Sequence, residues 1–158
     1  HAPIVLIVSG PPGTGKTTLA RQLARDLRLP LLTKDSIKEV LFDTLGWGDR
    51  EWSRRLGRAT IELLYLLMES ELAAGRSFLV ESNFKPELAS GRFLALRQKY
   101  PFNAVQVQCR TDGAVLVERY RLRAESGERH LGHVDLDSLP EVAPDLNKGF
   151  FEPLALAY

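Results

Sequence analysis

Residues 10–17 read Gly-Pro-Pro-Gly-Thr-Gly-Lys-Thr and match the pattern G-x-x-x-x-G-K-[ST] in full. Glycines permit the unusual backbone torsions of such a loop and let its amides approach an anion without a Cβ in the way. Lys16 can reach the β- and γ-phosphates of a nucleoside triphosphate, and the Thr17 hydroxyl can ligate Mg²⁺. The spacing therefore predicts a phosphate-binding loop, or P-loop, with contacts from Gly10, Gly13, Thr14, Gly15, Lys16, Thr17 and Thr18.

A carboxylate that can act on an acceptor molecule lies a short distance further on. Asp35 follows the apolar run 31–33, which we predict to be a strand, and ligands of open α/β sheets sit at the carboxyl ends of strands. There it can accept a proton from a substrate hydroxyl or orient that hydroxyl. Alternatively, Asp35 only caps a helix that begins near Ser36. Lys38, one turn along, can hold an anionic group of the acceptor or be an ordinary solvated lysine.

Basic side chains are concentrated in residues 119–133, namely Arg119, Arg121, Arg123, Arg129, His130 and His133. A guanidinium is always charged and its planar fork matches phosphate oxygens, so it suits the charge that develops on a transferring phosphoryl group. We select Arg123 and Arg129 for that role and expect His130 and His133 to contact the acceptor or to support the loop. The alternative is a set of solvated helix arginines. Glycines at 127 and 132 would let residues 119–133 hinge over the nucleotide as a lid that excludes water.

The remaining pattern predicts the elements that position these groups. Short apolar runs at 4–9, 31–33, 78–81 and 104–109 indicate strands, and the lack of alternation in the first predicts cover on both of its faces. Spacing and capping residues indicate helices over 16–27, 36–45, 50–74, 86–100 and 112–125. The run IELLYLLM in the third helix is apolar nearly all round, which predicts burial, and Pro140 and Pro144 predict a loop. The alternation of strands and helices indicates an α/β protein with a parallel sheet.

Composition limits the classes of function. The 158 residues are 44% hydrophobic and 26% charged, which is ordinary for one globular domain. A net charge of +1 gives no long-range field for polyanions, so a nucleic-acid partner is not favoured and would need a local patch. Cys109 has no cysteine to pair with, which fits a reducing compartment. Neither a membrane span nor a signal peptide is visible, and we expect a cytoplasmic protein without a membrane partner.

The segments GPPGTGKTTLA, LLTKDSIKEVL, VESNF and RYRLRAESGERHLGH together resemble the small P-loop kinases. The nearest groups are the zeta toxins, the chloramphenicol phosphotransferases and the polynucleotide 5′-kinases, among the AAA-type ATP-binding kinases. The resemblance implies a single P-loop kinase domain over residues 1–158, folded as a three-layer sandwich with strand order 2-3-1-4-5. It also implies that Asp35 is the base or hydroxyl orienter and that a lid arginine stabilises the phosphoryl group. No fifth strand is evident before Tyr158, and we expect that this strand can be missing from the chain.

The resemblance gives a role to the acid that ends the third strand. Glu81 stands where related proteins hold a carboxylate that binds Mg²⁺ through water or contacts the substrate, although Asp is commoner at that position. The alternative is a strand-end carboxylate without a function. Asn83 can donate a hydrogen bond to the acceptor or simply form a turn.

We therefore expect an ATP-dependent phosphotransferase that uses Mg²⁺ and moves the γ-phosphoryl group to a hydroxyl of a small molecule or nucleotide. Its catalytic residues would be Lys16, Asp35, Arg123 and Arg129. Three alternatives stay open: a regulatory module that binds ATP and hydrolyses it slowly or not at all, a toxin-like kinase of nucleotide sugars, and a 5′-polynucleotide kinase domain. A GTPase is disfavoured because the nearest match to an N-K-x-D motif, residues 147–150, lacks the acid.

Overall fold

The computed structural model describes residues 1–156. In that part the elements follow one another as β1 (Ile4–Ser9), α1 (Lys16–Leu27), β2 (Leu31–Thr33), α2 (Lys34–Leu45), α3 (Arg50–Ala73), β3 (Phe78–Glu81), α4 (Pro86–Lys99), β4 (Asn103–Gln108), α5 (Gly113–Ser126), the short 3₁₀ helix η1 (Leu131–His133) and α6 (Asp135–Lys148). The four predicted strands are confirmed, the last one beginning and ending one residue earlier than expected.

The four strands form one parallel sheet of order β2-β3-β1-β4. Glu81, the last residue of β3, lies opposite Val8 of β1 and Thr33 of β2. Because the strands are parallel, their carboxyl ends meet at one edge of the sheet, and the P-loop, Asp35 and Asn83 all follow directly from that edge. The predicted order is confirmed for its first four positions.

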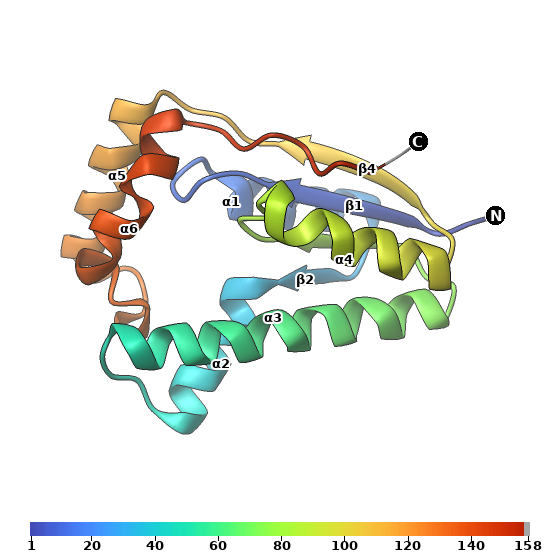
Figure 1. Cartoon of the computed structure of the whole chain (residues 1–158), viewed down its shortest axis with the longest axis horizontal. Coiled ribbons are helices and arrows are strands. Elements are labelled where there is room, and N and C mark those ends of the chain that lie inside the picture. The colour runs from blue at the N-terminus through green and yellow to red at the C-terminus, as the bar shows by residue number, and fades with distance from the viewer. Residues whose placement is uncertain (157–158) are drawn as a thin grey trace.

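The described residues contain no fifth strand. The segment that follows α6 instead lies along β4 (Figure 1), where the Gln106 side chain accepts a hydrogen bond from the Leu154 amide at 2.6 Å and donates one to the Leu154 carbonyl at 3.1 Å. Leu154 and Leu156 are buried in the main core. This segment therefore contributes apolar surface to the core without extending the sheet.

Helices cover both faces of the sheet, as Figure 1 shows, and the molecule is the predicted three-layer sandwich. Residues of α3 and α4 pack against one face, which includes Val5 and Ile7 of β1. Residues of α1 pack against the other face, which includes Leu6 and Val8. Successive residues of β1 thus point to opposite layers and are buried in both, which explains why the strand is apolar without alternation.

The alternative in which Asp35 caps a helix and the expectation that the third helix is largely buried are both wrong. Helix α2 begins at Lys34, because the Thr33 side chain accepts the Ser36 amide at 3.3 Å and is the N-cap. Asp35 is therefore a residue of the first turn and does not cap the helix. In α3, Leu66 is 61% exposed and Leu67 is 42% exposed, because this helix lies on the outside of the sandwich and turns only one face to the sheet.

The loop predicted around Pro140 and Pro144 is also wrong, since both residues lie inside α6. Each proline removes one backbone N–H from the helix. The two are four residues apart and exposed, so they share one face on which water can bond the freed carbonyls. The opposite face of α6 buries Leu146 against Leu116 of α5, and this packing outweighs the lost hydrogen bonds.

Helices α5 and α6 lie side by side at the end of the molecule opposite the chain ends (Figure 1). Their backbones touch near Gly113, where a Cβ would lie 2.1 Å from the carbonyl oxygen of Asn147, so only glycine fits. At the base of this hairpin the Thr111 amide donates to the Gly149 carbonyl at 3.0 Å. Among the described residues, none of the helices is both long enough and apolar enough to cross a membrane.

Candidate active site

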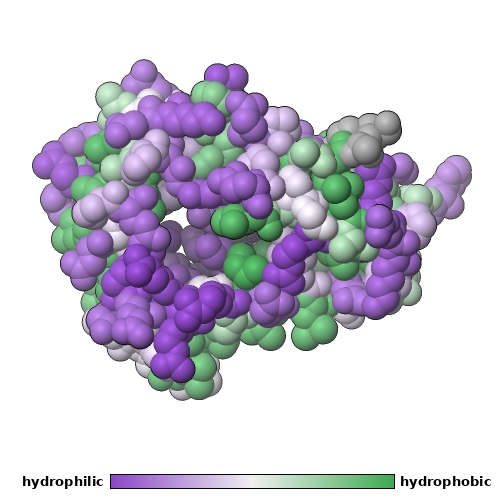
Figure 2. Space-filling model, viewed as in Figure 1, coloured by the Kyte–Doolittle hydropathy of each residue, from purple (hydrophilic) through white to green (hydrophobic). Residues whose placement is uncertain are grey.

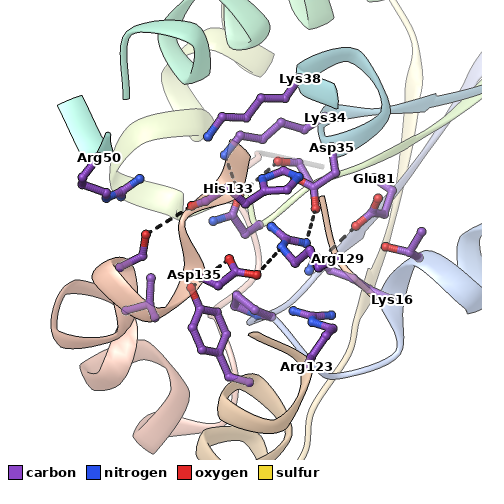
Figure 3. Close-up of a pocket in the computed structure, with 17 residues that line it drawn as sticks. Lys16, Lys34, Asp35, Lys38, Arg50, Glu81, Arg123, Arg129, His133 and Asp135 are labelled. Atoms are coloured by element: carbon purple, nitrogen blue, oxygen red, sulfur yellow. Dashed lines mark hydrogen bonds and ion pairs between the residues drawn. The ribbon is translucent and has the colours of Figure 1, made fainter. Parts of the chain in front are cut away.

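A cavity of about 140 Å³ lies where the carboxyl edge of the sheet faces α5 and α6 (Figure 3). In Figure 2 the surface is hollowed beside these helices, and hydrophilic residues border the hollow. The charged side chains that line the cavity are Lys16, Lys34, Lys38, Arg50, Arg123, Arg129, Asp35, Glu81 and Asp135. Six are basic and three are acidic, so the cavity is suited to anions.

The P-loop enters this cavity with its predicted backbone. Gly13 and Gly15 have φ angles of +84° and +83°, and nothing lies within 4 Å of a Cβ placed on Gly15, so torsion rather than space requires glycine there. No side chain caps the first turn of α1, and its free amides suit an anion. Thr14 donates its hydroxyl to the Pro11 carbonyl at 2.9 Å, whereas Thr18 is exposed.

Lys16, Thr17 and Glu81 form the inner wall. The Lys16 ammonium lies 3.9 Å from a Glu81 oxygen, and the Thr17 side chain hydrogen-bonds to the same carboxylate. Burial lowers the pKa of Lys16, while burial raises the pKa of Glu81 and the Lys16 charge opposes that rise. The hydroxyl and carboxylate oxygens beside the phosphate cradle fit Mg²⁺, which is held by few protein ligands together with phosphates and water. The described residues contain no cluster of three or more metal-ligating His, Cys, Asp or Glu side chains.

Asp35 faces the cavity from the first turn of α2 (Figure 3). One of its oxygens, Oδ2, accepts a hydrogen bond from Arg129 Nη1 at 3.0 Å. Burial raises the pKa of this carboxyl, but the Arg129 charge and those of neighbouring cations lower it more, so the net shift is downward. Asp35 is therefore an ionised acceptor of hydrogen bonds and a weak base.

Arg129 is shared between two carboxylates. Its Nε lies 2.7 Å from Asp135 Oδ2 while its Nη1 bonds Asp35, and the Tyr120 hydroxyl donates to the other Asp135 oxygen at 3.2 Å. The two carboxylates raise the pKa of Arg129 although burial opposes them. Sequence reasoning missed Asp135 and Tyr120, because the region of Asp135 read as a loop and Tyr120 carries no charge that draws attention.

Arg123 differs from Arg129 although both line the cavity. The Nε atoms of both are buried without a hydrogen bond among the described residues, but Arg129 Nε has the ion pair with Asp135, whereas Arg123 forms no ion pair there. Burial, reinforced by the Arg129 charge, lowers the pKa of Arg123. Of the other predicted lid arginines, Arg119 donates to the Gly13 carbonyl of the P-loop at 3.1 Å and Arg121 pairs with a carboxylate of its own helix.

A second group of cations lines the side of the cavity beyond Asp35. Lys38 donates to the Ser53 hydroxyl at 3.0 Å, and burial lowers the pKa of Lys38 to about 8. Lys34 donates to the Asn83 side-chain oxygen at 3.2 Å, so the Asn83 oxygen is occupied. Arg50, at the start of α3, completes the group. Lys34 and Arg50 were not foreseen, because single lysines and arginines at helix starts are common.

The two lid histidines have different positions. His133 lines the cavity, is only 4% exposed, and lies 3.0 Å from a Glu39 oxygen. Burial lowers the pKa of His133 to about 3, so the ring is neutral at pH 7. His130 lies outside the cavity lining and contacts Asp43 at 2.7 Å. Glu39 and Asp43 were not foreseen either.

Comparison with known proteins places this site in a family. A family model for the AAA domain matches residues 5–139. A candidate kinase from Chloroflexus aurantiacus J-10-fl has a crystal structure with 44% sequence identity and a TM-score of 0.88, covering 100% of this chain and 85% of that one. A chain of the Pnkp1/Rnl/Hen1 complex shares the fold at a TM-score of 0.62 and 19% identity, over 75% of this chain and 39% of its own.

Curated relatives match more locally. The cytidylate kinase of Pyrobaculum neutrophilum is 43% identical over 51 residues, which is 32% of this chain and 28% of that enzyme. The cytidylate kinase of Pyrobaculum aerophilum is 44% identical over 59 residues, which is 37% of this chain and 26% of that enzyme. The matched segments thus span about a quarter of these relatives. On the family match and the full-length structural likeness, the chain belongs to the AAA domain family and, within it, to the small P-loop kinase group.

Proposed function

We propose that the protein is an ATP-dependent phosphotransferase that moves the γ-phosphoryl group to a hydroxyl of a small anionic acceptor. One observation carries the proposal. Lys16 of the P-loop, Asp35 and Arg123 all line one small cavity. Triphosphate binding, acceptor orientation and charge stabilisation are the three requirements of phosphoryl transfer, and each has a side chain there.

The chain's own residues divide the reaction among them. The loop amides, the first turn of α1 and Lys16 bind the phosphates of ATP. Asp35 accepts a hydrogen bond from the acceptor hydroxyl and so directs the hydroxyl oxygen at the γ-phosphorus. Because its lowered pKa makes Asp35 a weak base, it suits this orienting role better than the role of taking up the proton. Arg123 neutralises charge on the phosphoryl oxygens as the bond loosens. Thr17 and Glu81 would hold Mg²⁺, which would supply positive charge beside the phosphates.

Lys34, Lys38 and Arg50 indicate the chemistry of the acceptor. They form the outer wall of the cavity on the far side of Asp35 from the P-loop (Figure 3). Buried ammonium groups are costly without a counterion, and two of these three are lysines whose pKa is lowered by burial. A phosphate or carboxylate on the acceptor supplies the counterion. The cytidylate kinases among the relatives are named for a nucleotide substrate, which carries a phosphate.

The test is a transfer assay with γ-labelled ATP and Mg²⁺ over paired acceptors: a sugar and its phosphate, a nucleoside and its monophosphate, and an oligonucleotide with a free 5′-hydroxyl. We expect labelled product from the anionic member of a pair. The Asp35→Asn variant should lose at least about 100-fold in transfer while its Kd for ATP stays within about threefold, and the exposed Asp137→Asn is the control. Release of free phosphate alone by the unaltered protein would refute the proposal and favour a regulatory module.

A further inference from the structure

Helix α2 carries three carboxylates on one face. Asp35, Glu39 and Asp43 are four residues apart, so they lie one above another along the helix. Each contacts a different side chain of the lid segment, residues 119–133. The contacts are Asp35 with Arg129 at 3.0 Å, Glu39 with His133 at 3.0 Å, and Asp43 with His130 at 2.7 Å. Three consecutive turns of one helix thus bind three residues within a stretch of five.

The packing between the two segments is close. Phe42 is 1% exposed, and its ring centroid lies 5.2 Å from those of both His130 and His133. Gly132 lies against the same ring: a Cβ on it would come within 2.5 Å of two ring carbons, so a larger residue cannot occupy this position unchanged. The aromatic contact therefore holds the histidines in register with the carboxylates.

Hydrogen bonding also orients His130. The Gly132 amide donates to its Nδ1 at 3.0 Å, so Nδ1 is an acceptor and the neutral ring carries its proton on Nε2. That proton points to Asp43, as the 2.7 Å contact requires. The lid backbone thus selects the tautomer that binds α2.

We propose that Glu39 and Asp43 are positioning residues. Through His133 and His130 they form a lid clasp (Glu39–His133 and Asp43–His130) that seats the lid segment on the acceptor-side helix and sets Arg129 on Asp35. Neither carboxylate lines the cavity, so both act through the lid rather than on a substrate. Because Arg119 ties α5 to the P-loop carbonyl of Gly13, the clasp joins the acceptor side of the site to the nucleotide side.

The alternative is a pair of ordinary surface contacts, which contribute little to stability. Three observations favour a specific interface between α2 and the lid segment. They are the regular spacing of the carboxylates, the burial of His133, and the glycine that the Phe42 ring requires at position 132.

The test compares two double variants of the full chain. Glu39→Gln with Asp43→Asn removes the charges of the two clasp carboxylates and leaves the size and shape of the side chains nearly unchanged. Glu62→Gln with Glu69→Gln is the matched control, because these carboxylates form ion pairs with Arg92 and Lys99 away from the site. The readouts are tryptic cleavage after Arg129 under native conditions and hydrogen exchange at the Gly132 and His133 amides.

We expect cleavage and exchange in the clasp variant to be about 2- to 25-fold faster than in the unaltered chain, since each pair lost contributes about 1.4- to fivefold. The rates should be unchanged in the control. His130→Asn, which also removes the ring contact with Phe42, should have at least the effect of Asp43→Asn, and adding Asp43→Asn to it should have no further effect. Equal rates in the clasp variant and the control would overturn the proposal.

A kinetic arm rests on the proposed function. With an active acceptor, the clasp variant should lose about tenfold in kcat, since misplacing a catalytic group by about 1 Å can cost more than that. The Kd for ATP should stay unchanged, whereas a general loss of structure would lower kcat and also weaken ATP binding. If the unaltered chain transfers no phosphoryl group, the proposed function fails, and the cleavage and exchange rates still decide whether the clasp exists.

Discussion

Replacing Asp135 with asparagine tests whether Arg129 is held between two carboxylates. The change removes the negative charge from the 2.7 Å contact with Arg129 Nε, in a side chain that is 8% exposed. Removing one partner of a buried ion pair costs about 3–5 kcal/mol, and less where the pair is partly exposed, as it is here. Asparagine keeps the shape of the side chain, and its amide group can still form a hydrogen bond with the Tyr120 hydroxyl, which both donates and accepts. We expect the free energy of unfolding to fall by about 2–4 kcal/mol, from a total of about 5–15 kcal/mol.

Urea unfolding followed by circular dichroism measures this loss. With a slope of about 2 kcal/mol per molar urea, the midpoint should fall by about 1–2 M. Asp137→Asn is the matched control, because Asp137 lies in the same first turn of α6 and loses the same interaction with the helix dipole. It is exposed and has no ion pair among the described residues, so we expect less than about 0.5 kcal/mol. If the two variants differ by less than that amount, Asp135 does not hold Arg129.

Three further predictions follow from single contacts. Burial lowers the pKa of Lys38 to about 8, so Lys38 loses its charge above that pH. Above it, kcat/KM for an anionic acceptor should fall about tenfold per pH unit. The Lys38→Arg variant, whose side chain is always charged, should not show this fall. Gly132→Ala should lower the free energy of unfolding, measured with urea, by about 1–3 kcal/mol, because the new methyl group clashes with Phe42. The control is Gly91→Ala in α4, where there is open space and an ordinary φ, and it should leave the free energy of unfolding unchanged or raise it. Arg123→Met should lower kcat about 1000-fold with little change in the Kd for ATP, and the surface variant Arg121→Met should change neither; an Arg123 variant that keeps its kcat would contradict the assigned role.

The sheet and the P-loop could be predicted from the sequence because their signals are local. The run 4–8 is apolar throughout, and the glycine pattern that begins at Gly10 has a fixed spacing, so strand, loop and helix are recognisable from adjacent residues. The placement of Asp35 at the carboxyl edge required only the rule for parallel sheets. In each case the information lies within about twenty residues.

The parts that were missed depend on what packs against what. Two prolines in α6 read as breakers because the sequence does not show which face of the helix meets water. The regular spacing of Asp35, Glu39 and Asp43 is visible, but their lid partners lie 87 to 94 residues away. Arg123 and Arg129 read alike as lid arginines, and only the position of Asp135 makes Arg129 the one that contacts two carboxylates.

The chain enters and leaves the hairpin of α5 and α6 at one place, because the two segments there are hydrogen-bonded to each other at Thr111 and Gly149. The close contact at Gly113 makes the two helices one rigid body. The far end of the 14-residue α5 is about 21 Å from that pivot. A rotation of about 10° therefore swings it by about 4 Å at the helical rise of 1.5 Å per residue, which is more than the length of any hydrogen bond across the cavity. Such a swing would open the cavity without either helix unwinding.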